Sequence, residues 1–546
     1  MKVSDLFVKC LENEGVKVIF GVPGEETEDL LFSLENSTIE FVPCRLELGA
    51  SFIANVWGRL TGKAGVCLAT LGPGATNLIT GVADANLDKA PVVAITGQGG
   101  LTRLHHESHQ FIDIVNIFRP ITKWNTAMNS PEVVCEVVRK AFKVAEYEKP
   151  GATHIELSED LAEQEVKRQL HPIEPKRVRR PSPDYKAIDR TIGMLLSAKR
   201  PLILAGNGAI RKLASTHLRQ LVERHKIPVA ATFMGKGALS DRSEQSLLCI
   251  GLGFKDYVME AVEASDLIIT VGYDIAECPP EKWNPGECKI VHIDFVPAEV
   301  YSKYNPEVEV VGDISGALWE LNQRLADSEL VFETEWYEPI RQRIFDDIAS
   351  YNLKDGEPFT IPGALNVIRE IMDDDGLIIS DVGSHKMWIA RNFPTCVPNG
   401  CIISNGLASM GIALPGGIAA SLIEPERQVV CAMGDGGFLM NSQELETAKR
   451  LGVGYTVVVF NDNDYGLISW KQSMSKGKSV STKLTNPDFK LYAESFGIKG
   501  YRPHNLDELK EQMRAAITSK ELCVVEVPVD ASVNNSLIEK LKHYWT

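Results

Sequence analysis

Two short turns that combine glycine with aspartate are the clearest chemical signal in this chain. The first is Gly434-Asp435-Gly436-Gly437, the second is Asn461-Asp462-Asn463-Asp464, and 24 residues lie between Gly436 and Asn461. Each turn follows an apolar, β-branched run, and a helix-like run separates them, as in one strand–helix–strand crossover. Both turns are therefore expected at the carboxyl ends of parallel, neighbouring strands, the edge at which open α/β sheets bind ligands.

The residue types in these turns suit a metal-bound diphosphate. Glycine lets the backbone approach a diphosphate and leaves its N–H groups free to donate. The carboxylates of Asp435 and Asp462, together with backbone oxygens, are ligands for a hard cation such as Mg²⁺, which also takes phosphate oxygens. Either turn alone is explained more simply as a loop that ends a strand. The pair at one crossover spacing favours a metal and diphosphate site.

Size and composition are those of a multidomain globular enzyme. The chain has 546 residues, too many for one hydrophobic core, with 44% hydrophobic and 24% charged residues. Its formal net charge is −16, which disfavours nucleic acid and anionic membranes as partners because both require a basic surface. A small anionic substrate remains compatible with this charge, since it needs only a local positive site.

The cysteines indicate a reducing compartment. There are eleven, an odd number, and no CxxC pair occurs, so neither a disulfide scaffold nor a zinc site is expected. Charged residues follow closely after the first methionine, which argues against a signal peptide, and no apolar run approaches the roughly 20 residues of a membrane span. We expect a cytoplasmic protein without a membrane partner.

A strand, a glycine-containing turn and a helix recur along the chain, in three blocks. This pattern predicts the α/β class, with three doubly wound parallel-sheet domains at residues 1–170, 186–330 and 355–546. A basic, proline-rich linker is expected near 165–185, and a polar helical segment near 330–350 marks the second boundary. The expected strands are Val16–Gly21, Gly65–Thr70, Pro91–Gly97, Pro201–Gly206, Asp266–Gly272, Lys289–Asp294, Leu377–Asp381, Gln428–Met433, Tyr455–Asn461 and Cys523–Val527.

The two turns and their spacing resemble the signature of the thiamine-diphosphate enzymes, which is GDG, about two dozen residues and then an Asn-Asn or Asn-Asp pair. The resemblance implies that the three domains are pyrimidine-binding, central and diphosphate-binding, and that the cofactors are thiamine diphosphate and Mg²⁺. It implies the Asp435 and Asp462 side chains and the backbone carbonyl of Asp464 as metal ligands.

The resemblance also points to Glu47, within VPCRLELGASFIANVWGRLTGK. In the family, a glutamate of the first domain protonates the aminopyrimidine ring, whose imino form removes the thiazolium C2 proton. Leu46 and Leu48 flank Glu47, and such neighbours would desolvate it and help it to exchange a proton near neutrality. Without the resemblance, a helix N-terminal glutamate explains Glu47 equally well. The family's glutamate and metal site meet across a dimer interface, so we expect at least a homodimer, and a homotetramer by resemblance.

Further cofactor contacts are implied by other matching segments. Ser404–Pro415 resembles the segment in which a backbone carbonyl, here of Ala408, holds the 4′-amino group and an apolar side chain, here Met410, supports the bent cofactor. A core methionine is the alternative for Met410. Ser384 and His385, in DVGSH, match donors to the diphosphate. The other implied contacts are Pro23, Gly72, Gly434, Gly436, Gly437, Tyr465, Gly466 and Leu467.

Over nearly the whole chain the resemblance is closest to the FAD-free, catabolic type of acetolactate synthase. Gln110, after His109, matches a glutamine that faces cofactor and substrate, and Asp462 in place of the commoner Asn fits this branch. The middle domain lacks a counterpart of the FAD-binding segments, so FAD is not expected. The implied reaction decarboxylates pyruvate, a small-molecule 2-oxoacid, and joins the two-carbon unit to a second pyruvate to give 2-acetolactate.

Some residues depart from that pattern and leave alternatives open. Leu46 and Leu48 replace the His and Gln that most carboligases carry, which suggests a non-oxidative decarboxylase that releases an aldehyde, or a pocket for longer or branched 2-oxoacids. Lys471 replaces a substrate-facing Gln and would bind the carboxylate of the second pyruvate, or is a surface lysine. An FAD-dependent relative, a non-catalytic thiamine-diphosphate-binding relative and a dinucleotide-binding dehydrogenase fit the residues less well.

Overall fold

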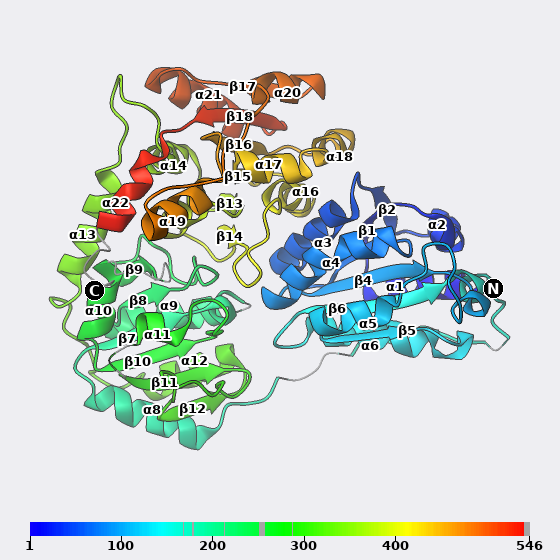
Figure 1. Ribbon diagram of the computed structural model, residues 1–546. Helices are drawn as coiled ribbons and strands as arrows, with labels where there is room; N and C mark the ends of the chain where they lie inside the picture. Colours follow the sequence, from blue (N-terminus) through cyan, green and yellow to red (C-terminus); the bar gives the residue numbers. More distant parts are fainter. Residues whose placement is uncertain are drawn as a thin grey trace. The chain divides into compact units, whose positions relative to one another are not determined.

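Three six-stranded sheets carry the fold, and every strand pair in them is parallel (Figure 1). The strand orders are β2-β1-β3-β4-β6-β5, β12-β11-β10-β7-β8-β9 and β14-β13-β15-β16-β18-β17. Strands that neighbour one another without following one another in the chain require crossover connections, which the intervening helices provide. The predicted α/β class with three parallel sheets is confirmed.

The computed structural model describes residues 1–167, 169–176, 180–211, 213–250, 257–284, 286 and 288–539. These residues belong to two compact units. Unit 1 consists of residues 1–178, 406–426 and 439–454, and unit 2 consists of residues 179–405, 427–438 and 455–546. Parts of the predicted linker, Arg168 and residues 177–179, lie outside the described residues.

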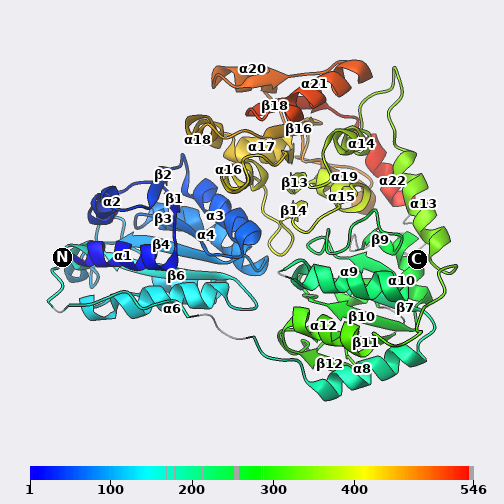
Figure 2. The same cartoon turned by 180° about the vertical axis from the view of Figure 1, so that it is seen from behind.

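The first sheet lies in unit 1, with helices on both of its faces (Figures 1 and 2). Its strands are β1 (Val18–Gly21), β2 (Glu40–Pro43), β3 (Gly65–Ala69), β4 (Val92–Gln98), β5 (Trp124–Ala127) and β6 (Ala152–Ser158). Its helices are α1 (Val3–Glu14), α2 (Glu28–Glu35), α3 (Glu47–Thr61), α4 (Pro73–Leu87), α5 (Ile114–Phe118), α6 (Val134–Glu146) and α7 (Glu159–Glu163).

Close backbone contacts hold α3 in place. A Cβ added at Gly58 of α3 would lie 2.2 Å from the carbonyl oxygen of Pro91, directly before β4. A Cβ added at Gly81 of α4 would lie 1.9 Å from Oγ of Ser51 on α3. Glycine lowers the stability of a helix interior, so these positions are explained by the close approach of neighbouring elements.

Unit 1 also contains two helices from much later in the chain, α16 (Ala413–Ile423) and α18 (Glu444–Leu451). α16 packs against α3, and residues 413–421 are all buried. The sequence of α16, ALPGGIAASLI, has almost no polar residue, and a helix that is apolar on all sides must be covered on all sides. This explains why α16 needs a partner beyond its own neighbours in sequence.

The second and third sheets lie in unit 2. The second sheet contains β7 (Pro201–Ala205), β8 (Val229–Ala231), β9 (Ser246–Cys249), β10 (Leu267–Val271), β11 (Lys289–Asp294) and β12 (Val308–Val311). Around it are α8 (Tyr185–Ser197), α9 (Ala214–His225), α10 (Tyr257–Ala264), α11 (Pro280–Trp283), α12 (Ile314–Arg324) and α13 (Glu338–Ala349).

The third sheet contains β13 (Leu377–Ser380), β14 (Cys401–Ile403), β15 (Val429–Gly434), β16 (Thr456–Asn461), β17 (Lys499–Tyr501) and β18 (Cys523–Pro528). The accompanying helices are α14 (Ile361–Ile371), α15 (Ser384–Asn392), α17 (Asp435–Asn441), α19 (Gly466–Lys476), α20 (Phe489–Ser495), α21 (Leu506–Thr518) and α22 (Asn534–Glu539). Every strand expected from the sequence is present, with bounds that agree within two residues.

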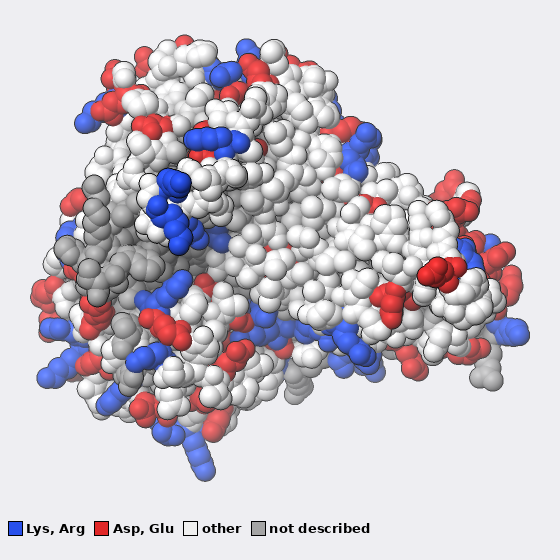
Figure 3. Space-filling model, in the orientation of Figure 1, with Lys and Arg blue, Asp and Glu red and all other residues white. Residues whose placement is uncertain are grey.

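The cysteines and surface charges agree with the composition. All eleven cysteines are free thiols. Within the described residues, no helix has the length and apolar character needed to cross a bilayer. Figure 3 shows acidic and basic side chains interspersed over one face of the protein.

One buried acid in the first sheet gives a pH-dependent prediction. Burial raises the pKa of Glu156, on β6, to about 7, while Gln98 donates to its carboxylate at 3.1 Å. Because this pKa lies above the ordinary value of 4.5, the stability that the neutral acid provides is lost as the pH rises through 7. We therefore expect Glu156→Gln to gain stability over the wild type as the pH rises from 5 to 8, by up to ~3 kcal/mol.

Thermal unfolding of both proteins at the two pH values measures this gain. The same difference in unfolding temperature at pH 5 and pH 8 would show that the Glu156 carboxyl is not buried in its neutral form.

Candidate active site

The two acidic turns lie at the ends of adjacent strands in unit 2. β15 and β16 pair in parallel, with Gly434 opposite Phe460, so Asp435 and Asp462 follow neighbouring strand ends. Burial and, second, the negative charge of Asp435 raise the pKa of Asp462 to about 7. Burial also raises the pKa of Asp435. Two buried carboxylates, one of which disfavours ionisation of the other, form a place that a cation would stabilise.

Asp464 faces a different partner. Its carboxylate accepts from Nζ of Lys483 at 3.0 Å, and its backbone N–H donates to Oδ1 of Asp462 at 3.1 Å. Lys483 thus binds one oxygen of this carboxylate, whereas Oδ1 is buried without a hydrogen-bond partner among the described residues, and the backbone carbonyl is the predicted metal contact. Among the described residues, no group of three or more His, Cys, Asp and Glu side chains could hold a metal ion. The set of two carboxylates and one carbonyl stays a prediction.

Asn486 joins the two turns and was missed in the sequence. Its amide nitrogen donates to Oδ2 of Asp435 at 2.6 Å, to Oδ1 of Asn461 at 3.0 Å and to Oδ1 of Asn463 at 3.2 Å. One side chain therefore links Asp435 to the turn that carries Asp462 and Asp464. The dipeptide Asn486-Pro487 indicates a turn, but no local pattern reveals which groups the asparagine side chain reaches.

The predicted diphosphate contacts surround the same strand ends. Ser384 is the first residue of α15 and is buried, and Gly466 is the first residue of α19, so two helix N-termini begin at this edge. Helix N-termini favour anions such as a diphosphate. His385 is buried, which lowers its pKa to about 4 and keeps it neutral. Its Nε2 is buried without a hydrogen-bond partner among the described residues, so it is the ring nitrogen that remains for a ligand.

The glycines at this edge lie so close to neighbouring side chains that any larger residue would collide with them. A Cβ at Gly436 would lie 2.7 Å from the ring of Tyr465, and one at Gly437 would lie 2.5 Å from Oδ2 of Asp381. A Cβ at Gly466 would lie 2.4 Å from Oδ2 of Asp462. The paired carboxylates and the unsatisfied His385 nitrogen fit a magnesium diphosphate. Leu467 packs partly against the hydrophobic core of the third sheet.

In unit 1, Glu47 is the first residue of α3 and is buried. Its Oε2 accepts from Nδ2 of Asn77 at 3.0 Å, and a Cβ at Gly74 would lie 3.1 Å from its Oε1. Asn77 was missed in the sequence, because a polar residue on the first turns of a helix carries no local signal of its target. Leu46 and Leu48 are half-buried on either side.

Other predicted residues gather at the same sheet edge as Glu47. Gly72 has φ +52° and a Cβ there would lie 2.6 Å from the carbonyl oxygen of Gln110, itself at φ +57°. Pro23 follows the end of β1, and the adjacent Gly24 packs against Thr70 after β3. The structure thus brings Gly72 and Gln110 together directly before α4, and it places Pro23 after β1, the strand that pairs with β3.

In unit 1, the part of the predicted pyrimidine-holding segment from Gly406 on is held by Asp84 of α4 and by Asp88, which directly follows α4. Asp88 accepts from the N–H of Gly406 at 2.7 Å, and Asp84 accepts from the N–H of Ser409 at 3.3 Å. Between them Ala408 has φ +58°, a left-handed conformation that costs a non-glycine residue of order 1 kcal/mol and occurs often at functional sites. Met410 is half-buried, which disfavours its reading as a core methionine.

Lys471 is exposed on α19, next to the buried Trp470. It lies five residues after Gly466, on the helix that begins at the predicted diphosphate edge. Its predicted contact with a substrate carboxylate stays a prediction.

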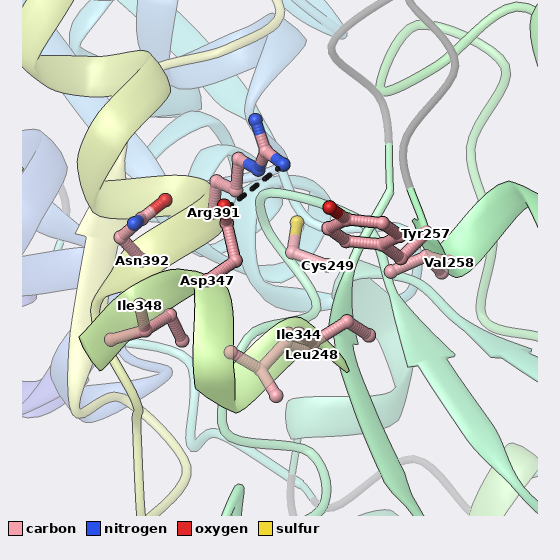
Figure 4. A pocket seen from close by; sticks show the side chains of 9 residues that line it. All are labelled: Leu248, Cys249, Tyr257, Val258, Ile344, Asp347, Ile348, Arg391 and Asn392. Carbon is pink, nitrogen blue, oxygen red and sulfur yellow. Dashed lines mark hydrogen bonds and ion pairs between the residues drawn. The ribbon is translucent and has the colours of Figure 1, made fainter. Parts of the chain in front are cut away.

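A small cavity elsewhere in unit 2 is separate from these residues. Arg391 and Asp347 form a buried ion pair of 3.3 Å beside it (Figure 4). The cavity has a volume of about 10 Å³, and it is lined by Leu248, Cys249, Tyr257, Val258, Ile344, Asp347, Ile348, Arg391 and Asn392. None of the predicted site residues lines it, and it is too small for a cofactor.

The chain matches three domain models of the thiamine pyrophosphate (thiamine diphosphate) enzymes. The N-terminal TPP binding domain matches residues 1–117, the central domain residues 188–321, and the C-terminal TPP binding domain residues 381–527.

Curated relatives match almost end to end. A probable acetolactate synthase large subunit of Methanocaldococcus jannaschii is 34% identical, covering 97% of this chain and 92% of the relative. The acetolactate synthase of Bacillus subtilis is 32% identical, covering 98% and 94%. A catabolic acetolactate synthase of Raoultella terrigena is 34% identical, covering 98% and 97%. With all three domains matched and full-length similarity of this kind, the chain belongs to the thiamine-diphosphate enzymes and is an acetolactate synthase-like member of that family.

Proposed function

We propose that the protein is a thiamine-diphosphate-dependent carboligase that decarboxylates pyruvate and joins the two-carbon unit to a second pyruvate, giving 2-acetolactate. One observation carries the proposal. The chain keeps both chemical halves of the site, the buried Glu47 and the paired carboxylates of Asp435 and Asp462, in a sequence that aligns over its length with acetolactate synthases.

Each half has a defined task in this proposal. Asp435, Asp462 and the carbonyl of Asp464 would hold Mg²⁺, while Ser384 and His385 would donate to the diphosphate. Glu47, oriented by Asn77, holds and transfers a proton through its carboxyl at the edge where α3 begins. When bound, thiamine diphosphate supplies the electron sink that decarboxylation of a 2-oxoacid requires.

We propose an enzyme without FAD. The position of Glu277, between β10 and α11, supports the absence of a dinucleotide site beside the second sheet. The N–H of Asn207, in the glycine-containing turn after β7, donates to Oε1 of Glu277 at 3.0 Å, and the hydroxyl of Thr232 donates to Oε2. In dinucleotide-binding folds such a turn offers its N–H groups to phosphates. Here a buried carboxylate already accepts one of them and would repel an anion. A flavin absorption spectrum in the purified protein would contradict this assignment.

We also propose a homodimer at least, and a homotetramer by family resemblance, with active sites completed across the dimer interface. Exposed apolar side chains near the Ala408 segment support a second copy as the partner. Leu407 is 41% exposed and Met440 is 41% exposed, and Leu87 is close to Gly406. Exposed apolar clusters of this kind mark protein interfaces.

Free thiols at all eleven cysteines support the proposed cytoplasmic location.

Product identification tests the proposed reaction. Incubation of the protein with pyruvate, thiamine diphosphate and Mg²⁺ is expected to yield 2-acetolactate as the main product, because the aligned relatives are acetolactate synthases. Branched and longer 2-oxoacids are assayed in parallel for aldehyde release. Leu46 and Leu48 favour this second candidate, a decarboxylase, because they make the surroundings of Glu47 apolar. Absence of both products from a cofactor-loaded protein would overturn the proposed function.

A further inference from the structure

The N-terminus of α3 is held by an acid from a distant part of the chain. Glu444 is the first residue of α18, is fully buried and lies with α3 in unit 1. Its Oε1 accepts from the backbone N–H of Leu46 at 3.0 Å and of Arg45 at 3.1 Å. Thr447 donates its hydroxyl to Oε2 at 2.6 Å. The carboxylate is therefore satisfied by three donors, as a buried acid must be.

This arrangement anchors the two residues that lead into α3. Leu46 occupies the N-cap position of α3, and an apolar side chain cannot accept hydrogen bonds from the backbone of the first turn. Glu444 accepts instead from the N–H of Leu46 itself and from the N–H of Arg45 before it, and it places a negative charge at the positive end of the helix dipole. The contact is also sterically fixed, since a Cβ at Gly49 would lie 2.6 Å from Oε1 of Glu444.

The two anchored residues lead directly into the proposed proton-transfer group. Leu46 precedes Glu47 without an intervening residue, so any shift of the Leu46 backbone moves the Glu47 carboxyl. Misplacement of a reacting group by about 1 Å costs on the order of 100-fold in rate. The three partners of Glu444, which are Arg45, Leu46 and Thr447, all lie in unit 1, whereas the predicted metal and diphosphate ligands lie in unit 2.

We propose that Glu444 is a positioning residue for Glu47, which fixes the first turn of α3 so that the Glu47 carboxyl reaches the aminopyrimidine of the bound cofactor. The proposal rests on the proposed thiamine-diphosphate chemistry. It assigns Glu444 an effect on proton transfer and none on the binding of the diphosphate.

Exchange of the cofactor's C2 proton for deuterium, without substrate, is the decisive measurement. Glu444→Ala is expected to slow this exchange about 10- to 100-fold, because the first turn of α3 loses its anchor. Glu444→Gln keeps one acceptor oxygen and is expected to slow it about three- to tenfold. Thiamine-diphosphate affinity, measured by calorimetry, is expected to stay within about threefold of the wild type in both variants.

Two further variants separate positioning from a general loss of structure. Glu446→Gln changes a half-buried acid two residues further along α18, whose recorded partners are the side chains of Arg450 and Arg45, and is expected to leave exchange within about twofold. In a Glu47→Gln background, Glu444→Ala is expected to add less than about twofold, because a residue that acts through Glu47 has nothing left to position.

Several results would overturn the proposal. The first is a folded Glu444→Ala protein that exchanges the C2 proton at the wild-type rate. The second is a loss of cofactor affinity as large as the loss in exchange rate. The third is an effect of Glu444→Ala on the exchange rate that is equally large in the wild-type and Glu47→Gln backgrounds. Should Glu444→Ala not fold, unchanged exchange in Glu444→Gln overturns it equally. Because exchange requires no 2-oxoacid, a negative acetolactate assay with normal exchange would refute the proposed substrate and leave the role of Glu444 standing.

Discussion

Glu47→Gln is expected to lower the turnover number by about 10²- to 10⁴-fold, the usual contribution of a positioned acid–base group. Glutamine preserves the shape of the side chain and an oxygen that accepts from Asn77, so the surrounding structure has no reason to change. It cannot exchange a carboxyl proton with the aminopyrimidine. The affinity for thiamine diphosphate is expected to stay within about threefold, since the metal and diphosphate contacts are supplied by other residues.

Steady-state kinetics and calorimetry on the same preparation measure the two effects. Glu25→Gln, which alters an exposed acid of unit 1, is the matched control and is expected to behave as the wild type. Unchanged turnover in Glu47→Gln would remove the assigned proton-transfer role. A loss of cofactor binding in proportion to turnover would show instead that Glu47 is a binding residue.

The second large effect is expected at Asp435. Asp435→Asn removes one of two anionic ligands from a hard cation, and we expect the Mg²⁺ concentration for half-maximal cofactor binding to rise about 100-fold or more. Asp462→Asn keeps an oxygen ligand, leaves the charge of Asp435 and relieves the repulsion that raises the pKa of Asp462. By the resemblance Asn is also the commoner residue there. Its effect is expected to be within about tenfold.

Magnesium titrations monitored by thiamine-diphosphate binding compare these variants. Asp464→Asn is the control, because its carboxylate faces Lys483 and only its backbone carbonyl is assigned to the metal. A small effect at Asp464 is therefore expected. Equal, severe effects at all three positions would contradict the assignment and indicate a site in which every carboxylate binds the cation.

The sequence predicted the features that depend on neighbours along the chain. The adjacency of β15 and β16 followed from one crossover of apolar runs, and the parallel pairing confirms it. One local expectation was wrong. Gly434–Gly437 was read as a turn, but α17 begins at Asp435, because Gly436 and Gly437 pack against Tyr465 and Asp381 and tolerate a helix there.

The remaining parts of the candidate site depend on contacts between distant segments, which no local pattern contains. Asn486 reaches Asp435 across 51 residues, and Glu444 reaches Leu46 across 398. The predicted bounds of the three domains stay predictions. The compact units group α16 and α18 with the first sheet, since an all-apolar helix such as α16 requires cover that its own sequence cannot specify.

The confinement of α3 has a consequence for how this enzyme could acquire new substrates. Gly49 lies close to Glu444, Gly58 lies close to the backbone before β4, and Ser51 lies close to Gly81. These three contacts restrict movement of α3 relative to its neighbours. Leu46 and Leu48 lie beside Glu47, and their hydrogen bonds to Glu444 and Ser51 are made by the backbone, so substitution of the two side chains would leave these bonds in place. Laboratory evolution could randomise these two positions. We expect the selected variants to differ in the 2-oxoacids they accept and to keep the position of the Glu47 carboxyl.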